Sequence, residues 1–366
     1  MNVLKKIVVL KKTAAYSGII ALTVLIILRP DHAMQAAENA LLLCGETIIP
    51  SLFPFFVCSG LLIYSGFAQT LAKICSPIMK PVFGISGSGS AAFVLGLISG
   101  YPLGASTACS LYESGYLTEG ETERLLGFCN NSGPLFILGA IGASLFGNPK
   151  IGWLIYISHI AAAFAVGIIL KFTKKEYEVI SPHMTISNPK MSIGEIFSTV
   201  ISNSVGSMLN VCGVIVFAST AAQLLLGFFP CDMWYTAFIT GLFEFASGTG
   251  AVAELGIDEF YKIILSAFIV GFAGISVHLQ VMSITSKYRL SLKKYILGKL
   301  MQAGISAAVV YFVIRYTNIL YKFTPAEKGS MSMGFFTAAG FVVFVSAVIA
   351  IVAVSVSKAR KTRAEL

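Results

Sequence analysis

The sequence predicts an all-α polytopic membrane protein in which about ten hydrophobic segments form an inverted repeat with broken or re-entrant helices. Hydrophobic residues make up 56% of the chain and charged residues 12%, with a mean hydropathy of +0.82, whereas soluble domains are about one quarter charged. Apolar windows of membrane-spanning length recur along the chain. Polar, helix-breaking clusters interrupt several of them, and such breaks survive in a bilayer only where protein or a wet cavity covers them.

Most of the apolar windows are close to the ~20 residues that a helix needs to cross a bilayer. They lie at residues 14–28, 48–68, 87–111, 124–147, 151–170, 204–227, 234–255, 260–285, 296–317 and 333–357. The first window follows a basic segment, as in a secretory signal. No small-x-small cleavage site follows Pro30, so we expect this window to be a retained first span.

The net charge of +9 arises from basic clusters that border the apolar windows. Lys and Arg gather at the N-terminus, after Leu170, around Lys287 to Lys299, and at the C-terminus. This is the positive-inside pattern of membrane proteins. We therefore expect an integral membrane protein with both termini in the cytoplasm, surrounded by the lipid bilayer, and no binding of nucleic acid.

The chain carries no signature of a metal, cofactor or catalytic site. Its seven cysteines lie mostly in apolar runs, with no C-x-x-C pair and no histidine at ligand spacing. It has no H-E-x-x-H motif and no G-x-S-x-G motif. We expect no metal, no cofactor and no enzymatic activity.

The charge pattern requires some windows to turn back inside the membrane. If every window crossed, the basic segment after Leu170 would lie outside. A re-entrant window at 87–111, turning at Ser99 to Gly104, returns that segment to the cytoplasm. The same argument applies to 234–255, which acidic residues flank with no lysine until Lys262. One unit then begins outside and the other inside, which makes an inverted repeat with broken helices at its interface.

Sequence matches and helix-start signals agree with two units. Gly96-Leu-Ile-Ser-Gly100 corresponds to Gly241-Leu-Phe-Glu244 at a similar place in the second half. Capping boxes at Thr118-x-x-Glu121 and Ser192-x-x-Glu195 predict helix starts, the second of an interfacial helix before the second unit. We divide the chain into an N-terminal tail with the first transmembrane helix (1–33), a first repeat with its following span (34–170), a cytoplasmic linker (171–192), a second repeat with its following span (193–320), and a last transmembrane helix with a basic tail (321–366).

Two polar clusters in the first unit are the main candidates for solute binding. Discontinuous helices in transporters use freed backbone groups to hold solute near the membrane midplane, and neutral amide side chains suit carboxylate or heterocycle edges. The alternative is that the clusters are packing kinks or interhelical hydrogen bonds. The candidates are Ser99, Gly100, Tyr101, Pro102, Gly104, Asn130, Asn131, Ser132, Gly133 and Pro134.

The second unit offers a corresponding but different set. Its candidates for solute binding are Ser247, Gly248, Thr249, Gly250, Ser276, His278 and Gln280. Glu244 lies near the middle of its window, where a bare carboxylate is costly. It is a candidate for proton or cation coupling, or a structural partner of an amide. His278 could help to hold an anion when protonated, or could be a structural histidine.

At these residues the chain resembles the nucleoside-recognition (Gate) domain membrane proteins. The resemblance rests on Pro50-Ser-Leu-Phe-Pro54-Phe-Phe, Gly96-Leu-Ile-Ser-Gly100-Tyr-Pro-Leu-Gly104-Ala, Glu121-x-Glu-Arg-Leu125, and Phe128-x-Asn-x-Ser-x-Pro-Leu-Phe136. It covers roughly residues 35–320 and is strongest in the first unit. Gate domains also occur in concentrative nucleoside transporters and ferrous-iron transporters. The likeness to the sporulation branch implies movement of dipicolinate into the developing spore, with the solute against Ser99–Gly104 and Asn130–Pro134.

Three functional hypotheses follow. The first is a membrane transporter or facilitator of a small, anionic heterocyclic solute, by resemblance dipicolinate, in the cell membrane or the forespore membrane. The second is a transporter of a nucleoside or another small solute. The third, from another class, is a non-transporting scaffold or assembly subunit in sporulation. A homo-oligomer is compatible with all three.

Overall fold

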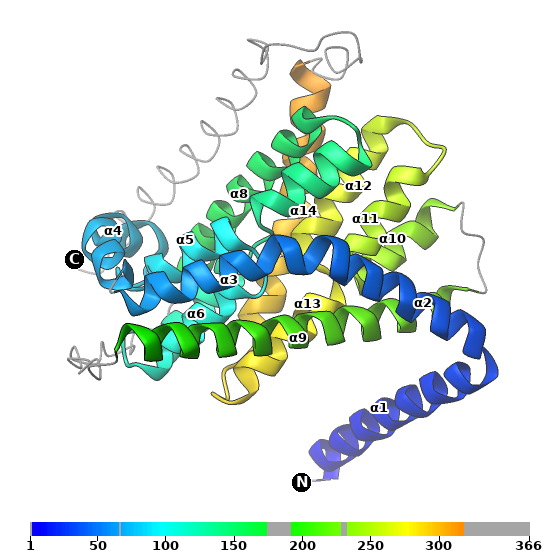
Figure 1. Cartoon of the computed structure of the whole chain (residues 1–366), viewed down its shortest axis with the longest axis horizontal. Helices are drawn as coiled ribbons and strands as arrows, with labels where there is room; N and C mark the ends of the chain where they lie inside the picture. The colour runs from blue at the N-terminus through cyan, green and yellow to red at the C-terminus, as the bar shows by residue number, and fades with distance from the viewer. Residues whose placement is uncertain (1, 66, 174–191, 228–232, 318–366) are drawn as a thin grey trace.

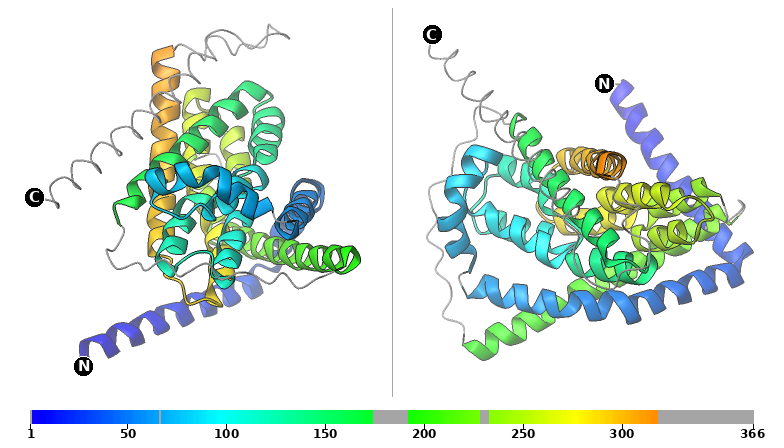
Figure 2. Two further views of the ribbon diagram at one scale, coloured as in Figure 1. Left: turned by 90° about the vertical axis from the view of Figure 1, so that its left-hand side faces the viewer. Right: turned by 90° about the horizontal axis from the view of Figure 1, so that it is seen from above.

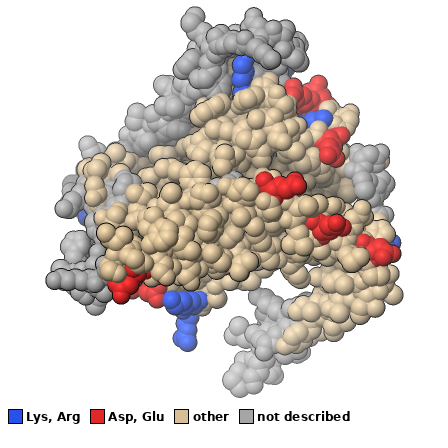
Figure 3. Space-filling view, viewed as in Figure 1, with Lys and Arg blue, Asp and Glu red and all other residues tan. Residues whose placement is uncertain are grey.

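The structure is built from helices that share one core. This computed structural model describes residues 2–65, 67–173, 192–227 and 233–317, and no strand occurs in these ranges. A single cluster of buried apolar side chains extends from Ala40 to Ile314 and joins the two halves of the chain. The described surface is mostly uncharged on the face in Figure 3, as expected for a protein surrounded by lipid.

Within each half of the chain, the helices follow one another closely along the sequence (Figure 1). The first half contains α1 (Asn2–Leu28), α2 (Pro30–Leu43), the π-helix η1 (Cys44–Ile48), α3 (Ile49–Tyr64), α4 (Phe67–Phe83), α5 (Gly89–Ser99), α6 (Leu103–Glu113), α7 (Glu119–Cys129), the π-helix η2 (Leu135–Leu145) and α8 (Pro149–Lys171). The second half contains α9 (Ile193–Leu226), α10 (Trp234–Phe243), α11 (Phe245–Glu254), α12 (Glu259–Phe272), α13 (Gly274–Ser286) and α14 (Lys293–Thr317).

Both predicted capping boxes are confirmed. In α7 the backbone N–H of Glu121 donates to Thr118 Oγ1 at 3.2 Å, and Glu121 Oε2 accepts from the Thr118 N–H at 3.0 Å. Ser192 and Glu195 form the same reciprocal pair at the start of α9. The predicted interfacial helix does not end before the next predicted window, because α9 continues without interruption for 34 residues.

Fewer uninterrupted spans are present than the sequence predicts. Four described helical stretches are long and apolar enough to cross a membrane, namely α8, α9, Glu259–Ser286 and α14. The pair Tyr16–Leu28 and Pro30–Ile48, bent by 101°, would make a fifth. The predicted windows 87–111, 124–147 and 234–255 are each divided into two short helices. The predicted window 333–357 lies outside the described residues.

Two of the divided windows fold back on themselves as hairpins. Helices α5 and α6 pack together on either side of the turn at Gly100–Pro102, and α10 and α11 on either side of Glu244. Glycines permit close approaches of the backbone at both hairpins. A Cβ at Gly248 would overlap the Gly241 Cα, and a Cβ at Gly96 would lie 3.0 Å from the Gly104 Cα and overlap the Cys129 carbonyl oxygen of α7.

The first hairpin opens at an end of the molecule that is rich in lysine, which we call the basic end. Lys287 Nζ, after α13, lies 2.8 Å from Glu113 Oε1 at the end of α6. Lys294 Nζ, in α14, lies 3.2 Å from Glu123 Oε2 in α7. Gly127 touches both Leu170 at the end of α8 and the Lys294 backbone. The ends of α6, α8 and α13 and the start of α14 therefore gather there.

The second hairpin opens at the opposite end. Helix α14 leaves the basic end at Lys293, and 18 residues later Tyr311 contacts Phe260 near the start of α12, with ring centroids 5.8 Å apart. Lys262 Nζ donates to the Ala253 carbonyl at 2.9 Å, which places the end of α11 beside this start. The two hairpins thus enter the molecule from opposite ends, and their tips meet inside it.

Helices α2 and α3 form a rod that runs antiparallel to α9 along one face (Figures 1 and 2). At one end, Arg29 Nη1 donates to the Gly227 carbonyl at 3.5 Å. Toward the other end, Gly60 of α3 lies against Val200 of α9. This pair of long elements covers the side of the first hairpin and forms one wall of a cavity described below.

The exposed cluster at the basic end provides a pH-dependent prediction. Hydrogen bonds from Lys287 and Tyr288 lower the pKa of the Glu113 carboxyl. A carboxyl with a lowered pKa stabilises the fold above its ordinary pKa, and that contribution is lost as the pH falls through the lowered value. Lys287→Ala should therefore reduce the fall in melting temperature that the parent protein shows as the pH is lowered from 6 to 3. The change should be small, since both side chains are at least half exposed. A Lys293→Ala control should leave the pH profile unchanged.

Candidate functional site at the meeting point of the helix breaks

The turn of the first hairpin is held tightly against the second break of the same unit. Gly100 has φ of +89°, and a Cβ at this position would lie 2.9 Å from the Gly133 backbone nitrogen. The peptide bond between Tyr101 and Pro102 is cis. Ser99 shares a hydrogen bond of 2.9 Å with Ser59 of α3. Gly104 faces the Cys129 carbonyl, which only a residue without a side chain permits.

Asn130, Asn131 and Ser132 are fully buried in the interruption between α7 and η2. The Asn131 amide donates to the Phe128 carbonyl at 2.8 Å, and its Oδ1 accepts from Gln302 Nε2 at 2.8 Å. The backbone N–H of Ser132 donates to His159 Nε2 at 3.2 Å. Gly133 is buried, and the half-buried Pro134 directly precedes η2. The predicted polar cluster is therefore bound to side chains of α8 and α14.

Lys299 of α14 is the buried cation next to this interruption. Its ammonium donates to the Asn130 carbonyl and, at 2.7 Å, to Gln302 Oε1. The Nζ atom also lies 5.3 Å from the centroid of the Tyr101 ring. Among the described residues, no carboxylate lies at ion-pair distance from it. A buried charge without an opposite charge is costly, so Lys299 is a candidate for a functional role.

The tip of the second hairpin carries the opposite charge but uses it differently. Glu244 is fully buried and caps α11, accepting hydrogen bonds from Ala246 N at 3.1 Å and Ser247 N at 2.6 Å. Both carboxylate oxygens are thereby occupied at a helix N-terminus, where negative charge is stabilised. The cap accounts for the position of this carboxylate, and a coupling role stays a prediction.

The other candidates in α11 lie along the helix rather than at the tip. Gly248 closes the hairpin against Gly241, and Thr249 Oγ1 donates to the Ala246 carbonyl at 2.9 Å. Gly250 faces open space, because no atom lies within 4 Å of the position that a Cβ would take there. The structure therefore does not bring Thr249 and Gly250 to the meeting point of the tips.

The break between α12 and α13 lies at Ala273 and Gly274, both with positive φ. His278 Nδ1 forms a 2.7 Å hydrogen bond with the Gly274 carbonyl, and its ring packs against Phe272 and Tyr295. Ser276 is buried, and its hydroxyl has no partner among the described residues. Gln280 is buried, and its Oε1 likewise lacks a partner in the described part of the chain.

The tips from both halves line one small cavity of about 20 Å³. The first half contributes Gly100, Tyr101, Ser132 and Gly133, and the second half contributes Phe245, Val277 and Gln280. The Tyr101 and Phe245 rings meet edge to face, with centroids 5.5 Å apart. A cavity of this size holds about one water molecule, so the tips are closed on each other in this structure.

Three residues of this site are not predicted by the sequence. Lys299 is expected to belong to the cytoplasmic basic cluster, and this expectation is wrong because the side chain is fully buried. His159 and Gln302 are not among the candidates, although both lie inside apolar windows. A polar or ionisable residue inside a membrane segment is a candidate functional residue by default. Applying this rule to the apolar windows could have identified these residues. The break of the first unit therefore has two ionisable partners among the described residues, His159 and Lys299.

Comparison with known proteins places these features in a family. The sequence profile of the Gate family, described as nucleoside recognition, matches residues 46–225. The sporulation integral membrane protein YlbJ of Bacillus subtilis strain 168 is 30% identical over 334 residues, which cover 82% of this chain and 81% of YlbJ. This chain belongs to the Gate family. The Gate match includes both breaks of the first unit, and no solved structure matches the chain.

Tyr101 connects the Gate-family hairpin to the second half, which yields a prediction. Its hydroxyl donates to the Val270 carbonyl of α12 at 2.9 Å, and the side chain is buried. Tyr101→Phe removes this bond and leaves a buried carbonyl unpaired, so we expect a loss of about 1–2 kcal/mol of stability. Thermal unfolding in detergent measures it. Tyr261→Phe, on a side chain that is 58% exposed, is the control, and equal melting temperatures for the Tyr101 variant and the parent would contradict the assignment.

Proposed function

We propose that this integral membrane protein transports or facilitates the passage of a small, anionic heterocyclic solute, with the two hairpins as halves of an inverted repeat. The observation that carries the proposal is the buried ammonium of Lys299, beside the Tyr101 ring and without a carboxylate partner in the described residues. An ammonium has three donors, of which two bind Asn130 and Gln302. A solute carboxylate would supply the missing negative charge.

The opposed hairpins support a translocation role over a purely structural one. Their tips enter from opposite ends and meet at residues from both halves. Transporters with inverted repeats bind solute at such interfaces. Because YlbJ is named a sporulation protein, we propose dipicolinate as the solute, and the cell or forespore membrane as the location, with cytoplasmic termini.

The decisive test is uptake of dipicolinate by liposomes that contain the purified protein, compared with the Asn130→Ala variant. Asn130 Oδ1 accepts from Ala105 N at 3.4 Å and its buried Nδ2 has no partner among the described residues, so the side chain has a donor to offer. We expect at least a fivefold loss of uptake in the variant. Absence of dipicolinate flux in the parent protein, in every gradient tested, would contradict the proposal.

A second candidate is a nucleoside or another neutral heterocycle, which the nucleoside-recognition description of the Gate family favours. Competition between uridine and dipicolinate in the same uptake assay distinguishes the two. Stronger inhibition by uridine than by unlabelled dipicolinate would favour the nucleoside. A scaffold or assembly subunit, with or without self-association, would instead tolerate substitution at Asn130 and Glu244.

A further inference from the structure

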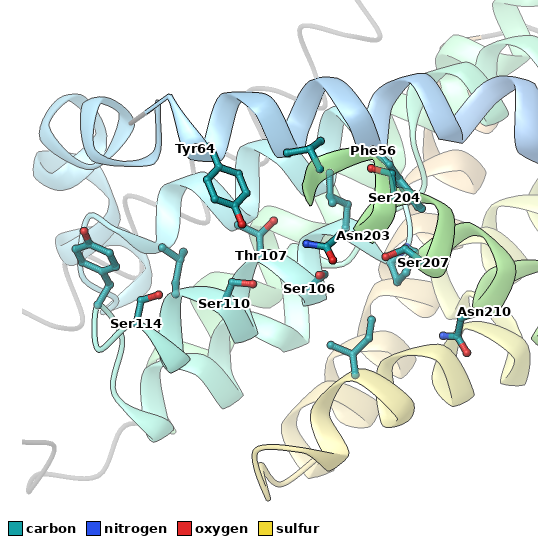
Figure 4. A pocket seen from close by; sticks show the side chains of 17 residues that line it. Phe56, Tyr64, Ser106, Thr107, Ser110, Ser114, Asn203, Ser204, Ser207 and Asn210 are labelled. Atoms are coloured by element: carbon teal, nitrogen blue, oxygen red, sulfur yellow. The ribbon is translucent and has the colours of Figure 1, made fainter. Parts of the chain in front are cut away.

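A second cavity lies between α3, α6 and α9, apart from the closed tips. Its volume is about 370 Å³, within the range of small-molecule sites. Figure 4 shows hydroxyl and amide side chains directed into it from two sides. Helix α6 contributes Ser106, Ser110 and its C-cap residue Ser114, and α9 contributes Asn203, Ser207 and Asn210.

The polar face of α9 indicates that this cavity contains water. Asn203, Ser207 and Asn210 follow one another at helical spacing on a helix that is apolar enough to span a membrane. All three are exposed, whereas Leu209, 67% exposed, lies on a different face and does not line the cavity. Asparagine facing lipid is costly, and polar residues of membrane helices face water-filled cavities or protein.

The chemistry of the lining defines a class of ligand. Among the described residues, none that lines the cavity is charged. The hydroxyl and amide groups supply donors and acceptors together, and the rings of Phe56 and Tyr64 supply flat apolar surface. Thr107 also lines the cavity; it is only 2% exposed, and its Oγ1 has no partner in the described part of the chain. This combination suits a small planar heterocycle with hydrogen-bonding substituents.

The cavity connects the basic end to the tip of the first hairpin. Ser114 lies next to Glu113, which bonds Lys287, and Pro102 lies at the other extreme, next to Tyr101. Helix α6 separates Pro102 from Ser114 by about 18 Å, at 1.5 Å per residue. A solute that enters at the basic end therefore meets neutral hydrogen-bonding groups first and the Lys299 ammonium, beside Tyr101, only beyond the tip.

We propose that the cavity between α3, α6 and α9 is a water-filled vestibule that binds a planar heterocyclic solute before it reaches the hairpin tip. This inference rests on the proposed transport function. It adds a binding site that is separate from the tips, and it places the entrance at the basic end.

Cysteine labelling tests the vestibule without any measurement of flux. Ser207→Cys and Ser110→Cys are placed in the full-length protein in oriented vesicles, and Leu209→Cys is the matched control on α9. A charged, membrane-impermeant thiosulfonate reagent is added from either side, and peptide mass spectrometry measures modification at each position. When the reagent is added from the side that carries Lys287, we expect the cysteines at positions 207 and 110 to react at least tenfold faster than the cysteine at position 209. Dipicolinate or uridine should slow that reaction at least threefold.

Two results would overturn the inference: reaction at positions 207 and 110 no faster than at 209, or fast reaction that neither dipicolinate nor uridine slows. These results are distinguishable from failure of the proposed function. Protection from labelling in a protein without flux would keep the binding site and reject transport. Flux without protection would keep transport and reject the vestibule.

Discussion

Replacing Lys299 with methionine is expected to reduce dipicolinate uptake by proteoliposomes at least tenfold while the protein still folds. Methionine fills a similar volume without a charge, and it removes the cost of burying an ammonium that no carboxylate of the described residues offsets. The ammonium contacts Asn130, Gln302 and the Tyr101 ring, so its loss removes the positive charge at the tips. Uptake is measured per amount of protein that elutes as a single species in size-exclusion chromatography.

Lys293→Met is the matched control, because Lys293 lies on the same helix but is exposed. Its uptake should remain within twofold of the parent. A folded Lys299→Met variant with parental uptake would show that the buried cation is structural, and the anionic solute would lose its main support.

Replacing Gly248 with alanine is expected to destabilise the second hairpin more than other single substitutions in α11. An alanine Cβ would overlap the Gly241 backbone, and backbone atoms cannot move aside without separating α10 from α11. Overpacking of this kind costs about 1–3 kcal/mol and sometimes more. We expect a lower melting temperature in detergent and a lower yield of folded protein.

Gly250→Ala provides the comparison, because nothing lies within 4 Å of a side chain there. Alanine is also the better helix former, by about 1 kcal/mol, so this variant should be as stable as the parent or more so. Equal melting temperatures for the two variants would contradict the close approach of α10 and α11.

The turning points of the chain were predictable because they depend on local chemistry. Pro102 and the glycines around it cannot continue an α-helix in lipid without help, and the lysines after Leu170 predict that a window before them turns back. Capping at Thr118 and Ser192 follows from side chains three residues apart. These features require no knowledge of what packs against them.

The residues that contact the helix breaks were not predictable, because they come from other parts of the chain. Asn131 meets Gln302 and Ser132 meets His159, separations of 171 and 27 residues. The sequence around Lys299 does not distinguish a side chain that faces the cytoplasm from one that faces the core. The packing of α14 against α7 determines that Lys299 is buried. The vestibule likewise requires α6 and α9 to face each other, which neither helix specifies alone.

The small volume between the Tyr101 and Phe245 rings has a consequence for affinity. A space for about one water molecule admits no heterocycle until the rings separate. The apparent dissociation constant at the tips is then the intrinsic one divided by the fraction of molecules that are open. Trimming the Phe245 ring would raise that fraction, so a variant with a weaker closed state would bind solute more tightly there.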